Sequence, residues 1–180
     1  MPYPTLTNWS LISMIEVKLT KDIMDRAKKK AASVGILPGS ITGGLSNVVG
    51  AIGEVIVGDV LDAEHVNTIH YDLVKNGNRI DVKTKRCNTK PFPNYDCSIA
   101  AHGSSQDCDT YVFVRVKIDM TRAWILGGIS KGRFLQQATR YSKGDVDPSN
   151  GFVFRTDCYN IPISKLEDIH VKETSQMYAV

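Results

Sequence analysis

Residues 71–83, YDLVKNGNRIDVK, have the pattern of a β-hairpin closed by a two-residue turn at Asn76-Gly77. A type I′ turn needs a positive φ at both central residues, which is why Asn-Gly is its strongest sequence signal. The turn fixes the register and sets Asp72 directly opposite Asp81 on one face, with Cβ atoms about 5 Å apart. Facing carboxylates repel each other unless a cation lies between them, so the hairpin predicts a metal site.

Lys83 is expected on the same face as the two aspartates, because strand side chains repeat with a period of two. The hairpin is predicted to span about residues 67–75 and 78–86, and in this register His70 faces Lys83 at the rim of the site. The opposite face is apolar and is expected to point into a core. It carries Leu73, Ile80 and Val82.

The composition is that of an ordinary globular chain, with 42% hydrophobic and 23% charged residues. A length of 180 residues suits one domain with a sizeable core, so residues 1–180 are predicted to form a single domain. No apolar run approaches the roughly 18 residues of a membrane helix, and no membrane partner is expected. The first residues, MPYP, lack the basic and then apolar plan of a signal peptide, which favours a cytoplasmic protein.

Net charge and cysteine spacing give weaker guidance. A formal net charge of +3 permits a nucleic-acid partner without requiring one. The four cysteines form no CxxC pair and have no close Cys/His spacing; they are Cys87, Cys97, Cys108 and Cys158. Reduced and mostly buried thiols are the simpler expectation, with a zinc site assembled from distant residues as the alternative.

Two helices are expected ahead of the hairpin. Thr20 can cap the first, which is amphipathic and ends at Gly35 ahead of Pro38. Its other face carries residues 28–30, KKK, as a solvated surface or, alternatively, as a contact for phosphate. Residues 39–44 are expected to form a loop.

The second helix is expected to start at Ser46 or Asn47 and to run to about Leu61. Three glycines in it would each cost about 1 kcal/mol relative to alanine, which indicates close packing against another element. They are Gly50, Gly53 and Gly58. Glu54 is the only charge between Asn47 and Asp59, and an acid in such an apolar helix needs a partner.

Strands are expected to dominate the second half of the chain. Residues 111–116 read as a strongly buried strand with a hairpin partner at 123–128, and further strands are predicted at 95–101 and 152–154. Ser130 can cap a short helix that includes Phe134, Leu135, Ala138 and Tyr141, and Ser164 with Glu167 has the spacing of a capping box. The order of elements favours an α/β (α+β) domain around a central mixed sheet flanked by helices.

An acid on a helix, a second acid, and then Asp-x-Lys on a strand resemble the motif of the PD-(D/E)XK nuclease superfamily. The matching residues are Glu54, Asp72 and Asp81-Val82-Lys83. The chain resembles the small restriction-endonuclease-like and phage-type nucleases of that superfamily, over about residues 45–130. It implies a restriction-endonuclease-like core. Tyr71 stands where the motif often has proline, and the interval between the two aspartates is short.

The resemblance also implies the role of each site residue. Asp72 and Asp81 would hold Mg²⁺, or Mn²⁺ in its place, and the Val82 carbonyl would add a ligand, since Mg²⁺ prefers hard oxygen ligands. Glu54 would hold a water or a second ion. Lys83 would position the attacking water or neutralise charge on the attacked phosphate.

Plainer interpretations stay open for the same residues. Asp72 and Asp81 could be exposed strand acids in surface salt bridges with Lys83 or Arg79, worth at most about 1 kcal/mol. Glu54 could be a buried acid bonded to a backbone amide. His65 and His70 are expected to be ordinary strand or loop residues rather than ligands.

The expected partner is DNA. Lys85, Arg86 and Lys90 extend positive charge from the site into the following loop, where a phosphate backbone could lie. Ser46 and Asn47 at the helix start, with Ser98 on the 95–101 strand, could donate hydrogen bonds to phosphate. The predicted function is that of a metal-dependent DNA endonuclease, and the resemblance implies double-stranded or branched DNA as its substrate. Cleavage of both strands would imply a homodimer, and a phage or mobile-element origin would suit the size. The alternatives are a Holliday-junction resolvase or repair nuclease of the same fold, a non-catalytic DNA-binding module, and an unrelated α/β protein.

Overall fold

The computed structural model describes residues 13–34 and 45–169, with the side chains of Val34, Leu45 and Ser46 excepted. Six strands form the main sheet, in the order β1-β7-β6-β4-β3-β2. They are β1 (Ile15–Lys18), β2 (Glu64–His65), β3 (Leu73–Lys75), β4 (Asn78–Cys87), β6 (Thr110–Lys117) and β7 (Arg122–Ser130). The sheet is mixed, because β4 and β6 run parallel while the other neighbouring strands are antiparallel. The predicted α/β (α+β) architecture, a mixed sheet flanked by helices, is therefore confirmed.

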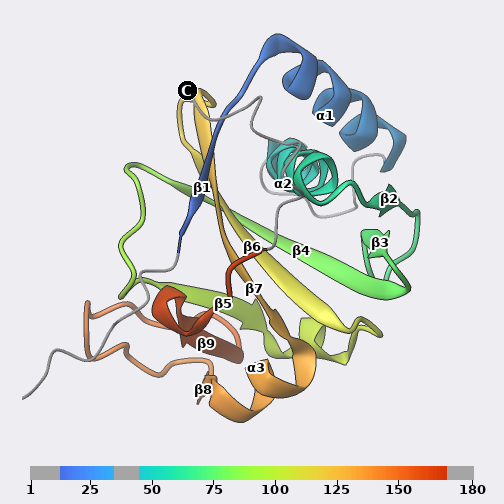
Figure 1. Ribbon diagram of the computed structural model, residues 1–180. Coiled ribbons are helices and arrows are strands. Elements are labelled where there is room, and N and C mark those ends of the chain that lie inside the picture. Colours follow the sequence, from blue (N-terminus) through green and yellow to red (C-terminus); the bar gives the residue numbers. More distant parts are fainter. Residues whose placement is uncertain (1–12, 35–44, 170–180) are drawn as a thin grey trace, which may run out of the picture.

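A second sheet of three strands packs beside the first, in the order β5-β9-β8. Its strands are β5 (Asp96–Ala100), β8 (Thr139–Tyr141) and β9 (Cys158–Pro162). The helices are α1 (Lys21–Val34), α2 (Leu45–Leu61) and α3 (Lys131–Gln137), with 3-10 turns η1 (Ala101–Ser105) and η2 (Ile163–Lys165). In Figure 1, α1 and α2 lie on one side of the main sheet, and the second sheet and α3 lie on the other.

Two hydrophobic cores fill the spaces between these layers. The first lies between α1, α2 and one face of the main sheet, and Ile52, Ile56 and Leu73 are fully buried in it. The second lies between the opposite face, the second sheet and α3, around Tyr111 and Phe134. Strand β4 therefore has one face toward the helices and the other toward the second sheet.

The predicted hairpin turn and register are correct. Asn76 and Gly77 have φ values of 50° and 78°, and Leu73 pairs with Ile80. The first strand is shorter than predicted, because β3 begins only at Leu73. Residues 67–72 instead form a turn in which Thr68 Oγ1 accepts hydrogen bonds from the N–H groups that follow it. The predicted placement of His70 opposite Lys83 on paired strands is therefore wrong.

Helix α2 lies close to the sheet at two of its glycines. A Cβ atom at Gly53 would collide with the side chain of Thr84 on β4, and one at Gly58 would lie 2.6 Å from Nε2 of His65. The expectation of close packing is confirmed at these two positions. It is wrong at Gly50, where a Cβ atom would meet nothing within 4 Å.

Two of the three predicted helix caps are present in the structure. Thr20 accepts the N–H of Ile23 at the start of α1, and Ser130 accepts the N–H of Arg133 at the start of α3. Helix α3 ends at Gln137, before Ala138 and Tyr141. Ser164 opens no helix, because η2 already begins at Ile163 and its N-cap residue makes no side-chain bond.

The predicted strand at residues 152–154 is wrong, since the structure forms only an isolated bridge between Val146 and Val153 there. The last strand is β9, which the sequence analysis missed. It pairs with β5, so the strand predicted at 95–101 exists but belongs to the second sheet. The expected helix end at Gly35 and the expected loop at residues 39–44 lie outside the described residues. Across residues 13–34 and 45–169, no helix has the length and apolar character needed to span a bilayer.

Candidate active site

The hairpin holds Asp72 and Asp81 together across its two strands. The N–H of Asp72 donates to the carbonyl of Ile80 at 2.9 Å, one residue off the register in which Leu73 pairs with Ile80. Oδ2 of Asp72 accepts the N–H of Val82 at 2.7 Å. Asp81 lies on β4 and is only 3% exposed. The two carboxylates are therefore neighbours, with Asp81 buried and Asp72 half-buried, although the paired register begins only at Leu73 and Ile80.

Helix α2 brings Glu54 to the same group of charges. The pKa of Asp72 is raised to about 7, chiefly by burial and then by the neighbouring charges of Glu54 and Asp81, against the opposing effect of the Val82 N–H. Oε2 of Glu54 also pairs with Nζ of Lys30 on α1, at 2.9 Å. The partner of Glu54 is thus a charged side chain, the Lys30 ammonium. Lys30, expected on a solvated face, faces this site.

Lys83 is the nearest cation to the buried aspartates. Its Nζ lies 2.7 Å from Oδ2 of Asp81 and donates to Oε1 of Gln106 at 2.8 Å. Nε2 of Gln106 donates in turn to the carbonyl of Ile69 at 3.0 Å, which fixes the amide. Arg79, the other cation considered for these acids, pairs instead with Asp107 and Asp109. The interpretation of Asp81 as an exposed strand acid is therefore wrong.

Asp81 keeps an unused acceptor. Lys83 approaches its Oδ2 outside hydrogen-bonding geometry, and this fully buried oxygen has no hydrogen-bond partner among the described residues. A buried carboxylate oxygen without a hydrogen-bond donor is costly; the Lys83 ammonium offsets part of that cost, and a divalent cation is another group that would do so. Two adjoining carboxylates with a third nearby are a donor set that Mg²⁺ accepts.

The residues thus fit a magnesium ion chemically, although the ion pairs to Lys30 and Lys83 compete for the same oxygens. In the part of the chain that the structure describes, no three His, Cys, Asp or Glu side chains are already arranged to enclose a metal. Val82 takes part through its N–H, and the ligand role of its carbonyl stays a prediction. For Mg²⁺ to bind these carboxylate oxygens, the ammonium groups of Lys30 and Lys83 would have to move away from them, toward an incoming phosphate.

The predicted DNA-binding residues do not all gather at the carboxylates. Lys85 lies on the same face of β4, four residues after Asp81, whereas Arg86 and Lys90 lie farther along, with Arg86 about 16 Å from Asp81. All three are exposed. Asn47 is half-buried about two helical turns before Glu54 on α2. The side chain of Ser46 is outside the described residues.

Sequence reasoning missed Gln106 and Arg115. Gln106 follows η1 and reaches the site only through the fold, and no local motif marks it. Arg115 lies beside Lys85 because β4 and β6 pair in parallel. The four cysteines are free, and Cys97, Cys108 and Cys158 are buried as expected.

Comparison with known proteins adds no assignment to this geometry: neither a family model nor a curated protein matches the chain.

Proposed function

We propose that this protein is a metal-dependent DNA endonuclease with Glu54, Asp72, Asp81 and Lys83 as its active site. The observation that carries the proposal is Asp72 in the field of both Glu54 and the buried Asp81, whose Oδ2 has Lys83 beside it but no hydrogen-bond partner among the described residues. Burying like charges destabilises a protein, so a cation that offsets their repulsion is the simplest reason for the arrangement. The proposal places the chain with the PD-(D/E)XK nucleases and gives it a restriction-endonuclease-like core.

Each residue has a distinct task in phosphodiester hydrolysis. Asp72 and Asp81, with the Val82 carbonyl, would hold Mg²⁺ or Mn²⁺. Bound there, the ion would act as a Lewis acid toward the phosphoryl group and lower the pKa of water. Glu54 accepts a hydrogen bond from the attacking water and orients it. Lys83 moves from Asp81 to the attacked phosphate and neutralises the charge that develops on it.

The reaction consumes one water for each bond cut. The oxygen of the water bonds to phosphorus while the bond from phosphorus to the leaving sugar oxygen breaks, and the leaving oxygen takes up a proton. Gln106 is the positioning residue of the set, since it holds the ammonium of Lys83 beside Asp81. Cleavage of both strands of a duplex would require a homodimer, and a cytoplasmic location fits a protein that acts on DNA.

The test is nicking of supercoiled and branched DNA by the wild type, Asp81→Ala and Lys83→Ala, with Mg²⁺, with Mn²⁺ and with EDTA. We expect nicking that needs the metal and falls at least about 100-fold in both variants. Lys165→Ala, which removes a positive charge far from the carboxylates, should cleave like the wild type. Preference for branched DNA would favour a resolvase or repair nuclease over a restriction-type enzyme.

A non-catalytic DNA-binding module is the second candidate, and the competing ion pairs of Lys30 and Lys83 favour it. They hold the site closed without any metal. DNA binding by a wild type that nicks no DNA and takes up no Mg²⁺ in calorimetry would establish this candidate and end the catalytic proposal.

A further inference from the structure

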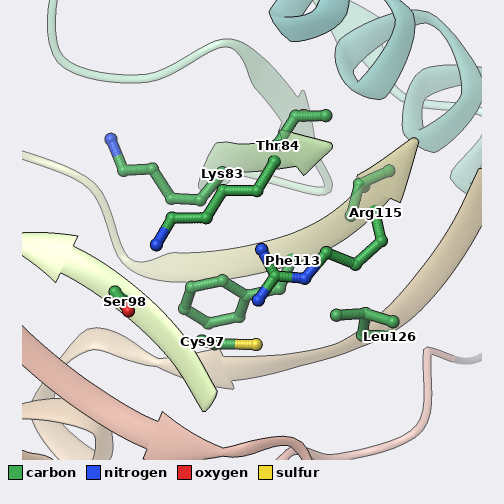
Figure 2. A pocket seen from close by; sticks show the side chains of 9 residues that line it. Lys83, Thr84, Cys97, Ser98, Phe113, Arg115 and Leu126 are labelled. Carbon is green, nitrogen blue, oxygen red and sulfur yellow. The ribbon is translucent and has the colours of Figure 1, made fainter. Parts of the chain in front are cut away.

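A basic cavity opens beside the carboxylates, on the face of β4 that points to the second sheet. It measures about 150 Å³, and Lys83, Lys85, Arg115 and Ser98 supply its polar groups. Figure 2 shows the Arg115 guanidinium reaching from β6 toward β5, where Cys97 and Ser98 lie. Lys83 belongs both to this cavity and to the candidate active site, so the two adjoin.

Lys83 is paired with Asp81, whereas Lys85 and Arg115 have no ion-pair partner among the described residues and only the charge of Asp96 in their neighbourhood. Lys85 makes no hydrogen bond or ion pair with any described residue, and Arg115 donates only to the carbonyl of Asp96, at 2.6 Å. The two cations are paired across the parallel strands β4 and β6, so their side chains lie next to each other. Exclusion of water lowers the pKa of Lys85, and the charge of Arg115 lowers it further. A phosphate would relieve this repulsion.

A larger groove of about 630 Å³ continues from the cavity and shares Lys85, Ser98 and Arg115 with it. Its volume falls within the range of about 300–1,000 Å³ that is usual for small-molecule sites. Tyr95 and Phe152 lie along it and are 45% and 53% exposed. Each ring makes an edge contact with one neighbouring ring, Phe92 and Phe154 respectively, and retains exposed surface on which a ligand could stack.

Polar groups for hydrogen bonding lie at the bottom of the groove. Asn160 is buried and donates through Nδ2 to Oδ2 of Asp96 at 3.4 Å. Asp147 also lines the groove, but its oxygens accept from Ser149 and Asn150 within its own loop. The groove is therefore lined by the aromatic rings of Tyr95 and Phe152, by the Asn160 amide and the Asp96 carboxylate, and by positive charge only where it meets the cavity.

We propose that the cavity and the groove bind one unpaired nucleotide of the substrate strand, with its phosphate at Lys85 and Arg115 and its base between Tyr95 and Phe152. A base in a duplex is stacked on both sides and cannot enter, so the nucleotide must be single-stranded or turned out of the helix. The inference rests on the proposed nuclease function, because the shared Lys83 places this nucleotide next to the bond that is cut. It names the substrate class as DNA with an unpaired nucleotide beside the cleavage site.

Binding is tested apart from cleavage, with a fluorescent single-stranded oligothymidylate in EDTA. We expect Lys85→Gln and Phe152→Ala each to weaken binding about tenfold, since stacking on an aromatic ring is worth about 1–3 kcal/mol per base. Lys85→Gln should also reduce the slope of log affinity against log salt by about 0.7, the value for one phosphate on a single strand. Both side chains are exposed, so these variants are expected to fold, and thermal unfolding checks this.

Matched controls separate the subsite from general charge and hydrophobicity. Lys165→Gln removes a positive charge elsewhere, and Val153→Ala trims the exposed neighbour of Phe152 outside the groove. Both should bind within twofold of the wild type. If a variant and its control weaken oligothymidylate binding equally, the nucleotide subsite is wrong. If Lys85→Gln weakens binding and Phe152→Ala does not, the base does not lie between Tyr95 and Phe152.

A cleavage assay distinguishes failure of the subsite from failure of the nuclease function. With Mg²⁺, the wild type should cut a duplex with one unpaired nucleotide at least about tenfold faster than the fully paired duplex, and Phe152→Ala should lose this preference. Equal cutting of both duplexes by the wild type would reject the subsite and leave the nuclease standing. A second outcome would reject the nuclease function and keep the nucleotide site. In it, the wild type cuts no DNA, while Lys85→Gln and Phe152→Ala weaken oligothymidylate binding and their controls do not.

Discussion

At the residue scale, the carboxylates of the candidate site destabilise one another in the metal-free protein. Asp72 is held near Asp81 by the N–H of Val82 and lies in the field of Glu54. Its pKa in the folded state, about 7, is above the ordinary value of 3.8, so the folded protein binds this proton more tightly than the unfolded chain. The contribution of Asp72 to stability therefore falls as pH rises from about 4 to about 7.

Asp72→Asn should stabilise the metal-free protein at pH 8 while abolishing cleavage. The neutral amide removes the charge that burial and the neighbouring acids oppose, and about 1 kcal/mol corresponds to about 2–4 °C in Tm for a chain of this size. Urea unfolding in EDTA at pH 4 and pH 8 measures the effect. The gain should be larger at pH 8, with exposed Asp107→Asn as the control; a loss of stability at pH 8 would contradict the account.

Gln106→Ala should slow cleavage about tenfold, less than the loss expected for Lys83→Ala. Gln106 contacts no reacting atom, but its Oε1 holds the Lys83 ammonium. Single-turnover rates at saturating Mg²⁺ test this, with Ser105→Ala as the neighbouring control. An effect on Mg²⁺ affinity with an unchanged rate would assign Gln106 to the metal site instead of to Lys83.

At the element scale, the site depends on how closely α2 approaches β4. Gly53 lies against Thr84 on the strand and precedes Glu54 directly, so the missing Cβ lets the helix bring its acid to the hairpin.

Gly53→Ala should destabilise the fold by about 1–3 kcal/mol, because the added methyl overpacks a tight contact. Gly50→Ala, one turn earlier on the same helix, meets no neighbour and should stabilise the fold by up to about 1 kcal/mol. Urea denaturation of the two variants makes the comparison. Equal changes in the free energy of unfolding for the two variants would show that α2 does not pack tightly against β4 at Gly53.

The elements that sequence could predict are those with local signals. Asn76-Gly77 specifies its own turn, and the register of two neighbouring strands followed from that turn alone. Strand β9 has no such signal: residues 158–162, CYNIP, become a strand by pairing with β5 about sixty positions earlier. The sequence could not predict that Lys85 and Arg115 are neighbours either. Parallel strands are joined by a long crossover, and no local motif fixes the register in which they pair. The acids of the site were thus predictable, whereas the cavity beside them was not.

At the scale of the whole molecule, strand β4 connects the two hydrophobic cores and both candidate sites. Its apolar face packs under α2, and its polar face carries Asp81, Lys83 and Lys85 toward the second sheet. Under the proposed function, the second sheet and α3 would complete the substrate side of the protein, so their packing on the main sheet should matter for activity.

Phe134→Ala should destabilise the protein by about 3–5 kcal/mol. The ring is fully buried, with its centroid 5.3 Å from that of Tyr111 and 6.0 Å from that of Phe113, and it joins α3 to the main sheet. Leu135→Ala, at an exposed neighbouring position, should cost under about 1 kcal/mol. Unfolding by urea reports both values, and a small loss for Phe134→Ala would mean that this layer packs independently of the sheet.

The most direct measurement is the single-turnover rate of plasmid nicking in Mg²⁺ for the wild type, Asp81→Asn and Asp109→Asn. Both substitutions replace a carboxylate by an amide. Asp81→Asn does so at the buried carboxylate beside Lys83, and Asp109→Asn does so at the ion pair with Arg79. The account predicts nicking by the wild type and by Asp109→Asn, and a rate at least about 100-fold lower for Asp81→Asn. Equal rates for the wild type and Asp81→Asn, or no nicking by folded wild type, would contradict it.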